Sequence, residues 1–312
     1  MQNKRIILAN PRGFCAGVDR AITIVEKALE KYGAPVYVRH EVVHNKYVVD
    51  GLKERGAIFI EEIRDVPEGA ILIYSAHGVP LSVRQEAEAK NLTMIFDATC
   101  PLVSKVHVEL KNLHRNQYEI IMIGHKGHPE VEGTMGQVDG GIHLIENEID
   151  VDNLPIARDA EKIAVVTQTT LSVDETKSII AKLKATYPNL RLPKNEDICY
   201  ATQNRQDAVK ELAKVCDAVL VIGSKNSSNS NRLKELAENL GVKSYLIDFD
   251  YEIQGEWLED VTSIGLTAGA SAPEVLVEGV INKLQSYGFT ATDTLNVVEE
   301  HMTFALPSAL RS

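Results

Sequence analysis

Short apolar runs separated by polar segments recur along the whole chain. The runs are rich in Ile and Val and are bounded by Gly or Asn. Such runs are typical of buried parallel strands when helices separate them. The separating segments 19–31, 176–187 and 205–215 carry apolar residues at helical spacing. The pattern therefore predicts an α/β fold built from parallel sheets.

The runs form a threefold repeat along the chain. One run in each copy leads into a cysteine, in RIILANPRGFC, TMIFDATC and NEDICYAT, and three further runs follow, most of them ending in polar loops. We predict three α/β units at 1–99, 100–195 and 196–281, each with a small parallel sheet, arranged as a pseudo-threefold trefoil. The helix VINKLQSYG and the run VVEEHMTFALP follow Gly279 and lie outside the third repeat, and the C-terminal tail, 282–312, is expected to dock on the first unit.

Composition and charge restrict the possible partners. With 44% hydrophobic and 25% charged residues among 312, the chain is typical of a folded globular protein. A formal net charge of −11 without a run of Lys and Arg disfavours nucleic acid. No apolar run approaches the roughly 20 residues of a membrane helix, and the stretch 6–9 is too short for a signal peptide. We expect a cytoplasmic protein without a membrane partner.

Four cysteines are too few for a disulfide scaffold. A lone cysteine is usually a small buried hydrophobe, and this interpretation suits Cys216 in the helical segment VKELAKVCDAV. Cys15, Cys100 and Cys199 instead occupy equivalent positions of the repeat, so they predict a shared metal site. The chain lacks a Cys-x-x-Cys pair, which argues against a zinc ribbon or an ordinary ferredoxin. Three thiolates can hold a [4Fe–4S] cluster with one open iron, or zinc with a water, and ligand count leaves both possible.

Loops after the predicted strands carry the other candidate residues. A lone histidine is more often structural, but four recur in such loops: His44, His77, His125 and His128. The other copies supply hydroxyl and amide groups: Thr169, Thr170, Ser227, Ser228, Asn229 and Ser271. Donor-rich loops at helix starts predict a phosphate site, because N–H groups and helix dipoles stabilise an anion. The alternative is that these side chains only cap helices.

Glu130 is the candidate acid. It lies two residues after His128 in the Gly-rich segment GHKGHPEVEGT. A carboxyl group shielded from water can hold the proton that a leaving hydroxyl requires. Asp97 and Glu132 are rivals, which we expect to be structural.

Several long motifs together resemble the LytB-type family of 4-hydroxy-3-methylbut-2-enyl diphosphate reductases. They are NPRGFCAGVDRAI, HEVVHN, SAHGV, DATCPLV, GHPEVEGTMGQ, TQTTLSVDET, DICYATQNR, GSKNSSNSNRL and TAGASAP, spread over residues 6–280. The resemblance implies a monomeric or weakly dimeric three-domain trefoil. It also implies an oxygen-sensitive [4Fe–4S] cluster held by Cys15, Cys100 and Cys199.

The resemblance further implies the last reaction of the methylerythritol phosphate isoprenoid pathway. Two electrons and two protons remove the C4 hydroxyl of the substrate, which meets the open iron, as water, and isopentenyl and dimethylallyl diphosphate result. Glu130 and Thr169 would serve the hydroxyl and the proton path. The diphosphate would be bound by His44, His77, His128, Ser227, Ser228, Asn229 and Ser271. Ferredoxin or flavodoxin would donate the electrons, and no G-x-G-x-x-G follows the first strand to bind a nucleotide donor.

Two alternatives remain at this level. A non-redox [4Fe–4S] dehydratase of the quinolinate-synthase type would use the open iron without a reductant. An iron–sulfur sensor would bind a phosphorylated ligand without turnover. A requirement for a reductant separates the first from the reductase, and turnover separates the second.

Overall fold

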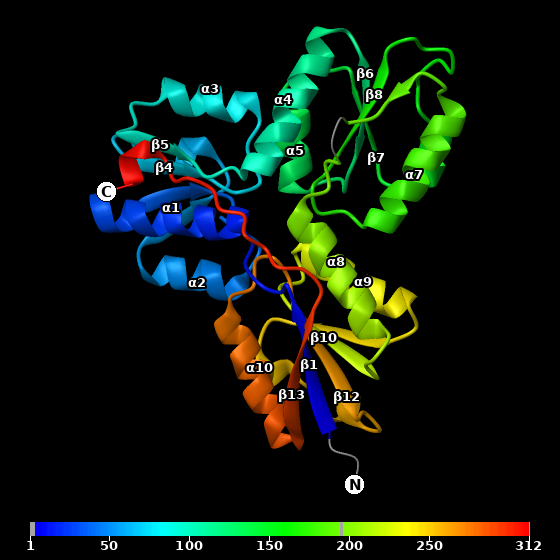
Figure 1. Ribbon diagram of the computed structural model, residues 1–312. Helices are drawn as coiled ribbons and strands as arrows, with labels where there is room; N and C mark the ends of the chain where they lie inside the picture. Colours follow the sequence, from blue (N-terminus) through cyan, green and yellow to red (C-terminus); the bar gives the residue numbers. More distant parts are fainter. Residues whose placement is uncertain (1–3, 194–195, 312) are drawn as a thin grey trace. The chain divides into compact units, whose positions relative to one another are not determined.

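Parallel strands form the framework of the molecule. The computed structural model describes residues 4–193 and 196–311, and within these ranges it contains three parallel sheets (Figure 1). The first has the order β3-β2-β4-β5, with β2 at Val36–Arg39, β3 at Ala57–Ile60, β4 at Ile71–Tyr74 and β5 at Met94–Asp97. The second has the order β7-β6-β8-β9, with β6 at Glu119–Ile123, β7 at Ile142–Ile145, β8 at Ile163–Thr167 and β9 at Leu190–Arg191.

The third sheet combines segments from both ends of the chain. Its order is β11-β10-β12-β1-β13, with β1 at Lys4–Asn10, β10 at Ala218–Ile222, β11 at Lys243–Ile247, β12 at Ser263–Ala268 and β13 at Phe289–Asn296. In Figure 1 the blue strand β1 lies between β12 and the dark orange β13. The three sheets and their helices confirm the predicted α/β class.

Helices connect the strands, and their apolar faces pack on the sheets. In α4, Val103, Val106, Leu110 and Leu113 recur at helical spacing and are buried, and Pro101 begins the helix at a position where no N–H bond is lost. The helices are α1 Ala16–Tyr32, α2 Lys46–Glu54, α3 Leu81–Ala89, α4 Pro101–Arg115, α5 Pro129–Met135, α6 Glu148–Asp152, α7 Val173–Thr186, α8 Tyr200–Ala213, α9 Ser228–Asn239 and α10 Glu274–Ser286. None of the described helices is both long and apolar enough to cross a bilayer.

The chain forms two compact units. The first unit comprises Met1–Val18, His44–Gly51 and Tyr200–Thr303, and it contains the five-stranded sheet. The second comprises Asp19–Val43, Leu52–Cys199 and Phe304–Ser312, and it contains both four-stranded sheets. Within the sheets, the interior strands β4, β8 and β10 are buried along their whole length.

Strand order shows how the repeat is built. In each sheet one strand precedes a cysteine and occupies the fourth position of the strand order: β1, β5 or β9. The strand at the third position, β12, β4 or β8, lies beside it. β1 therefore pairs with residues of the predicted third unit rather than with the other strands of the predicted first one, 1–99. An apolar run shows that a strand is buried but does not identify its partner, because parallel partners lie far apart in sequence. The unit boundaries themselves stay a prediction.

The C-terminal tail contains a strand that the apolar pattern misses. β13, FTATDTLN, alternates little in hydrophobicity and is largely exposed, because it is the edge strand beside β1. Farther along, the carbonyl groups of Ala305 and Ala309 accept hydrogen bonds from Arg20 and Lys31 of α1 at 2.9 and 2.7 Å. The tail therefore contacts both β1 and α1.

Candidate functional site

The three repeat cysteines share one local structure. Each directly precedes a helix: Cys15 precedes α1, Cys100 precedes α4 and Cys199 precedes α8. Each donates its backbone N–H to a carbonyl two residues beyond the end of the adjoining strand. The bonds are Cys15 to Ala270 after β12 at 3.2 Å, Cys100 to Ala76 after β4 at 2.9 Å and Cys199 to Thr169 after β8 at 3.0 Å. The same backbone geometry thus recurs at each thiol.

Exposure separates these three cysteines from the fourth. Cys15, Cys100 and Cys199 are partly exposed, whereas Cys216 is buried and has its thiol pKa raised to about 12 by desolvation. Cys216 lies in the turn beyond the end of α8 rather than inside a helix, and its burial matches the prediction. The repeated placement of three partly exposed thiols fits an iron–sulfur group held by three cysteines.

The structure does not itself show a metal centre. Cys15 belongs to the first unit, and Cys100 and Cys199 belong to the second. Within the described residues, no three side chains of His, Cys, Asp or Glu stand together in a way that could hold a metal ion. The convergence of the three thiols therefore stays a prediction.

In the second unit, a cluster of His77, His128, Glu130 and Thr169 comes together, which we call the His–Glu cluster. The imidazole rings of His77 and His128 meet edge to face, with centroids 5.8 Å apart. Both oxygens of Glu130 accept hydrogen bonds from Thr169, Oε1 from the backbone N–H at 2.6 Å and Oε2 from the hydroxyl at 3.0 Å. These predicted site residues are thus neighbours although three different segments supply them: the loop after β4, the start of α5 and the loop after β8.

Helix α5 sets the orientation of two members of the His–Glu cluster. Glu130 lies in the first turn of α5 rather than in a loop, and His128 is the N-cap residue. The Nδ1 atom of His128 accepts the backbone N–H of Glu130 at 3.1 Å. In the neutral ring this acceptor role places the proton on Nε2, so that Nε2–H can donate to an anion.

Close packing of α5 on the SAHGVP loop holds His77 near His128. A Cβ atom on Gly133 of α5 would lie 3.0 Å from the carbonyl oxygen of Gly78, and one on Gly136 would lie 2.5 Å from Pro80. Gln137 donates its side-chain N–H to the carbonyl of Val79 at 2.8 Å. The two glycines therefore allow α5 to approach the SAHGVP loop closely, and the His–Glu cluster depends on this approach.

Burial changes the protonation of Glu130. Desolvation raises the pKa of its carboxyl to about 7, although the two hydrogen bonds from Thr169 lower it, and the nearby charge of Asp197 raises it further. The carboxyl of Asp197 is itself buried, accepts the N–H of Thr167 at 3.0 Å and has a pKa raised to about 7 by desolvation. Glu130 is thus a buried acid that carries a proton near neutral pH.

The rival carboxylates have structural surroundings. Asp97 accepts hydrogen bonds from Arg84 at 2.7 Å and from the N–H of Thr99 at 2.9 Å. Its pKa is lowered by these contacts despite the opposing and largest effect, desolvation. Glu132 is exposed on α5. Asp97 therefore differs from Glu130 by its pairing with a cation, and Glu132 differs by its exposure to solvent.

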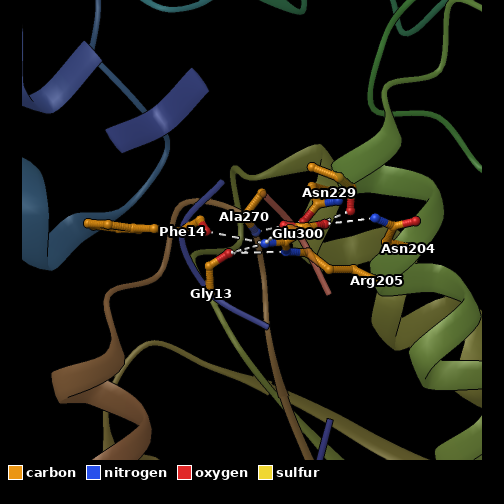
Figure 2. Close-up of polar contacts among 8 residues, drawn as sticks. Gly13, Phe14, Asn204, Arg205, Asn229, Ala270 and Glu300 are labelled. Atoms are coloured by element: carbon orange, nitrogen blue, oxygen red, sulfur yellow. Dashed lines mark hydrogen bonds and ion pairs between the residues drawn. The ribbon is translucent and has the colours of Figure 1, made fainter. Parts of the chain in front are cut away.

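In the first unit, the predicted phosphate loops gather around the start of α9. Ser227 is the N-cap and accepts the N–H of Ser230 at 3.3 Å, while Ser228 and Asn229 form the first turn. The oxygen of Asn229 accepts the N–H of Ala270 at 2.8 Å, as Figure 2 shows. Ser271 donates its hydroxyl to the carbonyl of His44 at 2.8 Å. We call these residues, Ser227, Ser228, Asn229, Ser271 and His44, the α9 loop set.

Asn229 supplies the clearest sign of a ligand in the α9 loop set. Its Nδ2 atom is buried and makes no hydrogen bond among the described residues, whereas its oxygen is satisfied by Ala270. A buried amide donor without an acceptor is costly, so a binding group with acceptor oxygens is expected there. A diphosphate fits this requirement. Ser227 also caps α9, so the helix-capping role that the sequence left as an alternative holds for this residue.

Sequence reasoning missed three polar residues beside these clusters. Gln168 is fully buried and accepts the N–H of His125 at 3.0 Å, and its amide donates to Thr170 at 2.9 Å. Asp197 and Arg205 are also buried. All three occur inside the motifs TQTT, DICYAT and ATQNR, but a sequence does not reveal which polar residues will be buried.

Comparisons of sequence identify relatives over nearly the whole chain. The family described as LytB protein matches residues 6–285. A protein of Chromobacterium violaceum named 4-hydroxy-3-methylbut-2-enyl diphosphate reductase is 62% identical over 308 residues, covering 99% of this chain and 98% of its own. A protein of the same name from Aromatoleum aromaticum is 59% identical over 312 residues, covering 100% and 99%.

Solved structures give the same result. The structure of the E-1-hydroxy-2-methyl-but-2-enyl-4-diphosphate reductase from Plasmodium falciparum is 41% identical, covers 99% of this chain and 97% of its own, and has a TM-score of 0.95. A second structure, of an (E)-4-hydroxy-3-methyl-but-2-enyl diphosphate reductase, is 33% identical, covers 91% and 99%, and has a TM-score of 0.65. From these matches and the repeated cysteine motifs, the chain belongs to the LytB protein family.

Proposed function

We propose that the chain is a 4-hydroxy-3-methylbut-2-enyl diphosphate reductase, an oxidoreductase of isoprenoid synthesis. The observation that carries the proposal is the backbone bond repeated at Cys15, Cys100 and Cys199, which prepares three thiols in the same way. The names of its relatives and its membership of the LytB family support it. The reaction yields isopentenyl and dimethylallyl diphosphate.

The chemistry is a reductive dehydroxylation. The C4–O bond of the allylic alcohol breaks, the carbon skeleton takes up two electrons and one proton, and the hydroxyl leaves with a second proton as water. Cys15, Cys100 and Cys199 would hold a [4Fe–4S] cluster, since they match its ligand chemistry and leave one corner without a thiolate. The bound cluster would supply the electrons for cleavage of the C–O bond. A ferredoxin or flavodoxin is the proposed source of these electrons.

Glu130 holds the proton for the leaving hydroxyl. With a pKa of about 7, its buried carboxyl is largely protonated at slightly acid pH and can still give the proton up. The hydroxyl of Thr169, 3.0 Å from Oε2 of Glu130, is placed to pass a proton or to hold the substrate hydroxyl. Burial keeps bulk water away from this pair.

The proposed contacts to the diphosphate come from histidine, asparagine and serine side chains rather than from lysine or arginine. His128 offers Nε2–H because its Nδ1 accepts a backbone N–H, and Asn229 offers a buried amide N–H. The remaining proposed contacts come from His44, His77, Ser227, Ser228 and Ser271. Hydrogen bonds to a charged acceptor are the stronger kind, so such donors can bind diphosphate without a net positive site.

Variants of the cysteines test the proposal. Replacing Cys15, Cys100 or Cys199 by Ser should each remove most of the cluster absorbance after anaerobic reconstitution, together with reductive turnover. Cys216→Ser is the matched control and should retain both, because Cys216 is buried away from solvent. Loss of absorbance in Cys216→Ser as severe as in the other three would contradict the assignment of ligands.

The need for a reductant separates the proposed reaction from a dehydratase. The balance above consumes two electrons per product, whereas a non-redox dehydratase consumes none. We expect no formation of isopentenyl or dimethylallyl diphosphate without an electron donor. When a donor is present, two electrons should be consumed for each molecule of product. Saturable binding without any turnover would instead favour a ligand sensor.

A further inference from the structure

Three cations hold the backbone of the loops that precede the cysteines. Each lies on the helix that follows one cysteine, five or six residues beyond it: Arg20 in α1, Lys105 in α4 and Arg205 in α8. None of them belongs to the clusters described above. Each contact lies within a single compact unit.

Arg205 makes the most complete of these contacts (Figure 2). It is fully buried, and its guanidinium donates to the carbonyl of Gly13 from Nε at 3.0 Å and from Nη2 at 2.7 Å. Nη2 also lies 3.3 Å from the carbonyl of Phe14. Gly13 and Phe14 are the two residues before Cys15, so that Arg205 fixes the approach of the chain to this thiol.

Arg20 and Lys105 make corresponding contacts with the other two loops. Arg20 donates to the carbonyls of Thr99 at 3.2 Å and Asp97 at 3.3 Å, just before Cys100. Lys105 donates to the carbonyl of Glu196 at 3.2 Å, three residues before Cys199. Its ammonium also lies 3.8 Å from the carboxylate of Asp197.

The contacts follow a cyclic order along the chain. The helix after Cys15 holds the loop of Cys100, the helix after Cys100 holds the loop of Cys199, and the helix after Cys199 holds the loop of Cys15. Simple packing does not require this arrangement. A buried guanidinium is costly to desolvate unless its donors are satisfied, and an apolar side chain could fill the same space.

The C-terminal tail completes two of the three contacts. Glu300 accepts hydrogen bonds from Arg205, from Nη1 at 2.9 Å and from Nη2 at 3.3 Å, and thereby neutralises a buried charge. Arg20 donates from Nε to the carbonyl of Ala305 at 2.9 Å. The tail therefore orients the same side chains that hold the loops of Cys15 and Cys100.

We propose that Arg20, Lys105 and Arg205 are positioning residues. Each fixes the cysteine of another copy of the repeat: Arg20 fixes Cys100, Lys105 fixes Cys199 and Arg205 fixes Cys15. Glu300 positions Arg205. That these contacts hold three cluster ligands in place rests on the proposed function. The contacts themselves do not depend on it.

Thiol reactivity tests the inference in the full-length chain, kept anaerobic and reduced before any cluster is reconstituted. The rate of alkylation by iodoacetamide is measured at each cysteine by peptide mass spectrometry over a range of pH and is expressed per thiolate, because removal of a cation also changes the ionisation of a nearby thiol. Arg205→Gln should increase the rate at Cys15 about tenfold, the effect of losing a charge-assisted hydrogen bond on local opening. The rate at Cys199 should not change, although Cys199 directly precedes the helix that carries Arg205.

Further variants make the pattern specific. Glu300→Gln leaves Arg205 in place and should also accelerate Cys15, and Arg205→Lys should restore only part of the protection because lysine lacks the planar fork. Arg20→Gln should accelerate Cys100, and Lys105→Gln should accelerate Cys199 to a smaller extent. Lys214→Gln is the control, because Lys214 is exposed just beyond α8 and its ammonium pairs with Glu211, at 2.6 Å, rather than with a loop before a cysteine.

Several outcomes would overturn the inference. These are acceleration at the cysteine of the same copy, equal acceleration at all four cysteines including the buried Cys216, or an unchanged rate at Cys15 in Arg205→Gln and Glu300→Gln. Alkylation needs neither cluster nor substrate. The crossed pattern in a chain that assembles no cluster would therefore reject the proposed function and retain the positioning contacts.

Discussion

Glu130 shows how a single carboxyl group is prepared for proton transfer. Burial disfavours its charged form, while Thr169 donates to both of its oxygens and limits the rise of the pKa to about 7. A carboxyl group without the two donors would be harder to ionise, and one exposed to water would lose its proton too early. The sequence identified Glu130 by its neighbourhood, but only the structure shows the burial and the pairing with Thr169.

Replacing Glu130 by Gln tests its role as the acid. The amide keeps the size and much of the hydrogen bonding but cannot supply a proton. We expect turnover to fall by a factor on the order of 10² to 10⁴, the usual contribution of general acid catalysis. Binding of the diphosphate and the cluster spectrum should persist in Glu130→Gln. Glu132→Gln, the control from the exposed face of α5, should retain turnover, diphosphate binding and the cluster spectrum. More than about a third of wild-type turnover in Glu130→Gln would assign the proton to another group.

The pKa of Glu130 also predicts a dependence of stability on pH. The unfolded carboxyl releases its proton near pH 4.5 and the folded one near 7, so the folded chain binds the extra proton between these values. The free energy of unfolding contributed by this group is therefore complete below about pH 4.5 and is lost as the pH rises toward 7. Glu130→Gln cannot titrate, so its stability relative to wild type should rise by on the order of 1–3 kcal/mol across this window. The measurement is chemical denaturation of both proteins at pH 5 and at pH 7.5. The same difference in free energy of unfolding between wild type and variant at both pH values would contradict the raised pKa.

Helix starts carry much of the candidate site, and they do so with two functions at once. Ser227 caps α9 through the N–H of Ser230, and His128 caps α5 through the N–H of Glu130. The choice between capping and phosphate binding that the sequence left open is therefore not exclusive. A cap leaves further donors of the same turn directed outward, where an anion can accept them.

A pair of N-cap variants separates the two functions of Ser227. Ser172 caps α7 through the N–H of Glu175 at 3.2 Å and lies outside the α9 loop set. Ser227→Ala and Ser172→Ala should each lower the free energy of unfolding by about 1 kcal/mol. Only Ser227→Ala should also weaken the affinity for a diphosphate inhibitor, by roughly tenfold or more, as measured by calorimetry. Equal affinities in the two variants would leave Ser227 with the capping role alone.

Elements were predicted where an apolar face exists and missed where it does not. The interior strands β4, β6, β8, β10 and β12 are nearly continuous runs of buried apolar residues, so that composition alone indicates them. β13 is an exposed edge strand whose sequence, FTATDTLN, is mostly polar. The buried side chains of Asp197 and Arg205 were missed for a related reason, because their partners come from distant segments and only the folded chain reveals them.

For the whole molecule, the threefold repeat is the feature that connects fold and chemistry. Three sheets share one strand order, and the cysteine of each follows the strand at the same place in that order. The sequence showed the repeat through the spacing of apolar runs. It could not show that β1 joins the sheet of β10–β12, because an apolar run does not determine its neighbour across a sheet.

Cys15, Cys100 and Cys199 are the proposed ligands of a [4Fe–4S] cluster with one open iron that would meet the allylic diphosphate. Mössbauer spectroscopy of the anaerobically reconstituted protein, recorded with and without 4-hydroxy-3-methylbut-2-enyl diphosphate, tests this central proposal most directly. We predict four iron sites, of which one alone changes its isomer shift and quadrupole splitting when the substrate is added. A spectrum that the substrate leaves unchanged, or one in which all four sites have thiolate-like parameters, would contradict the account.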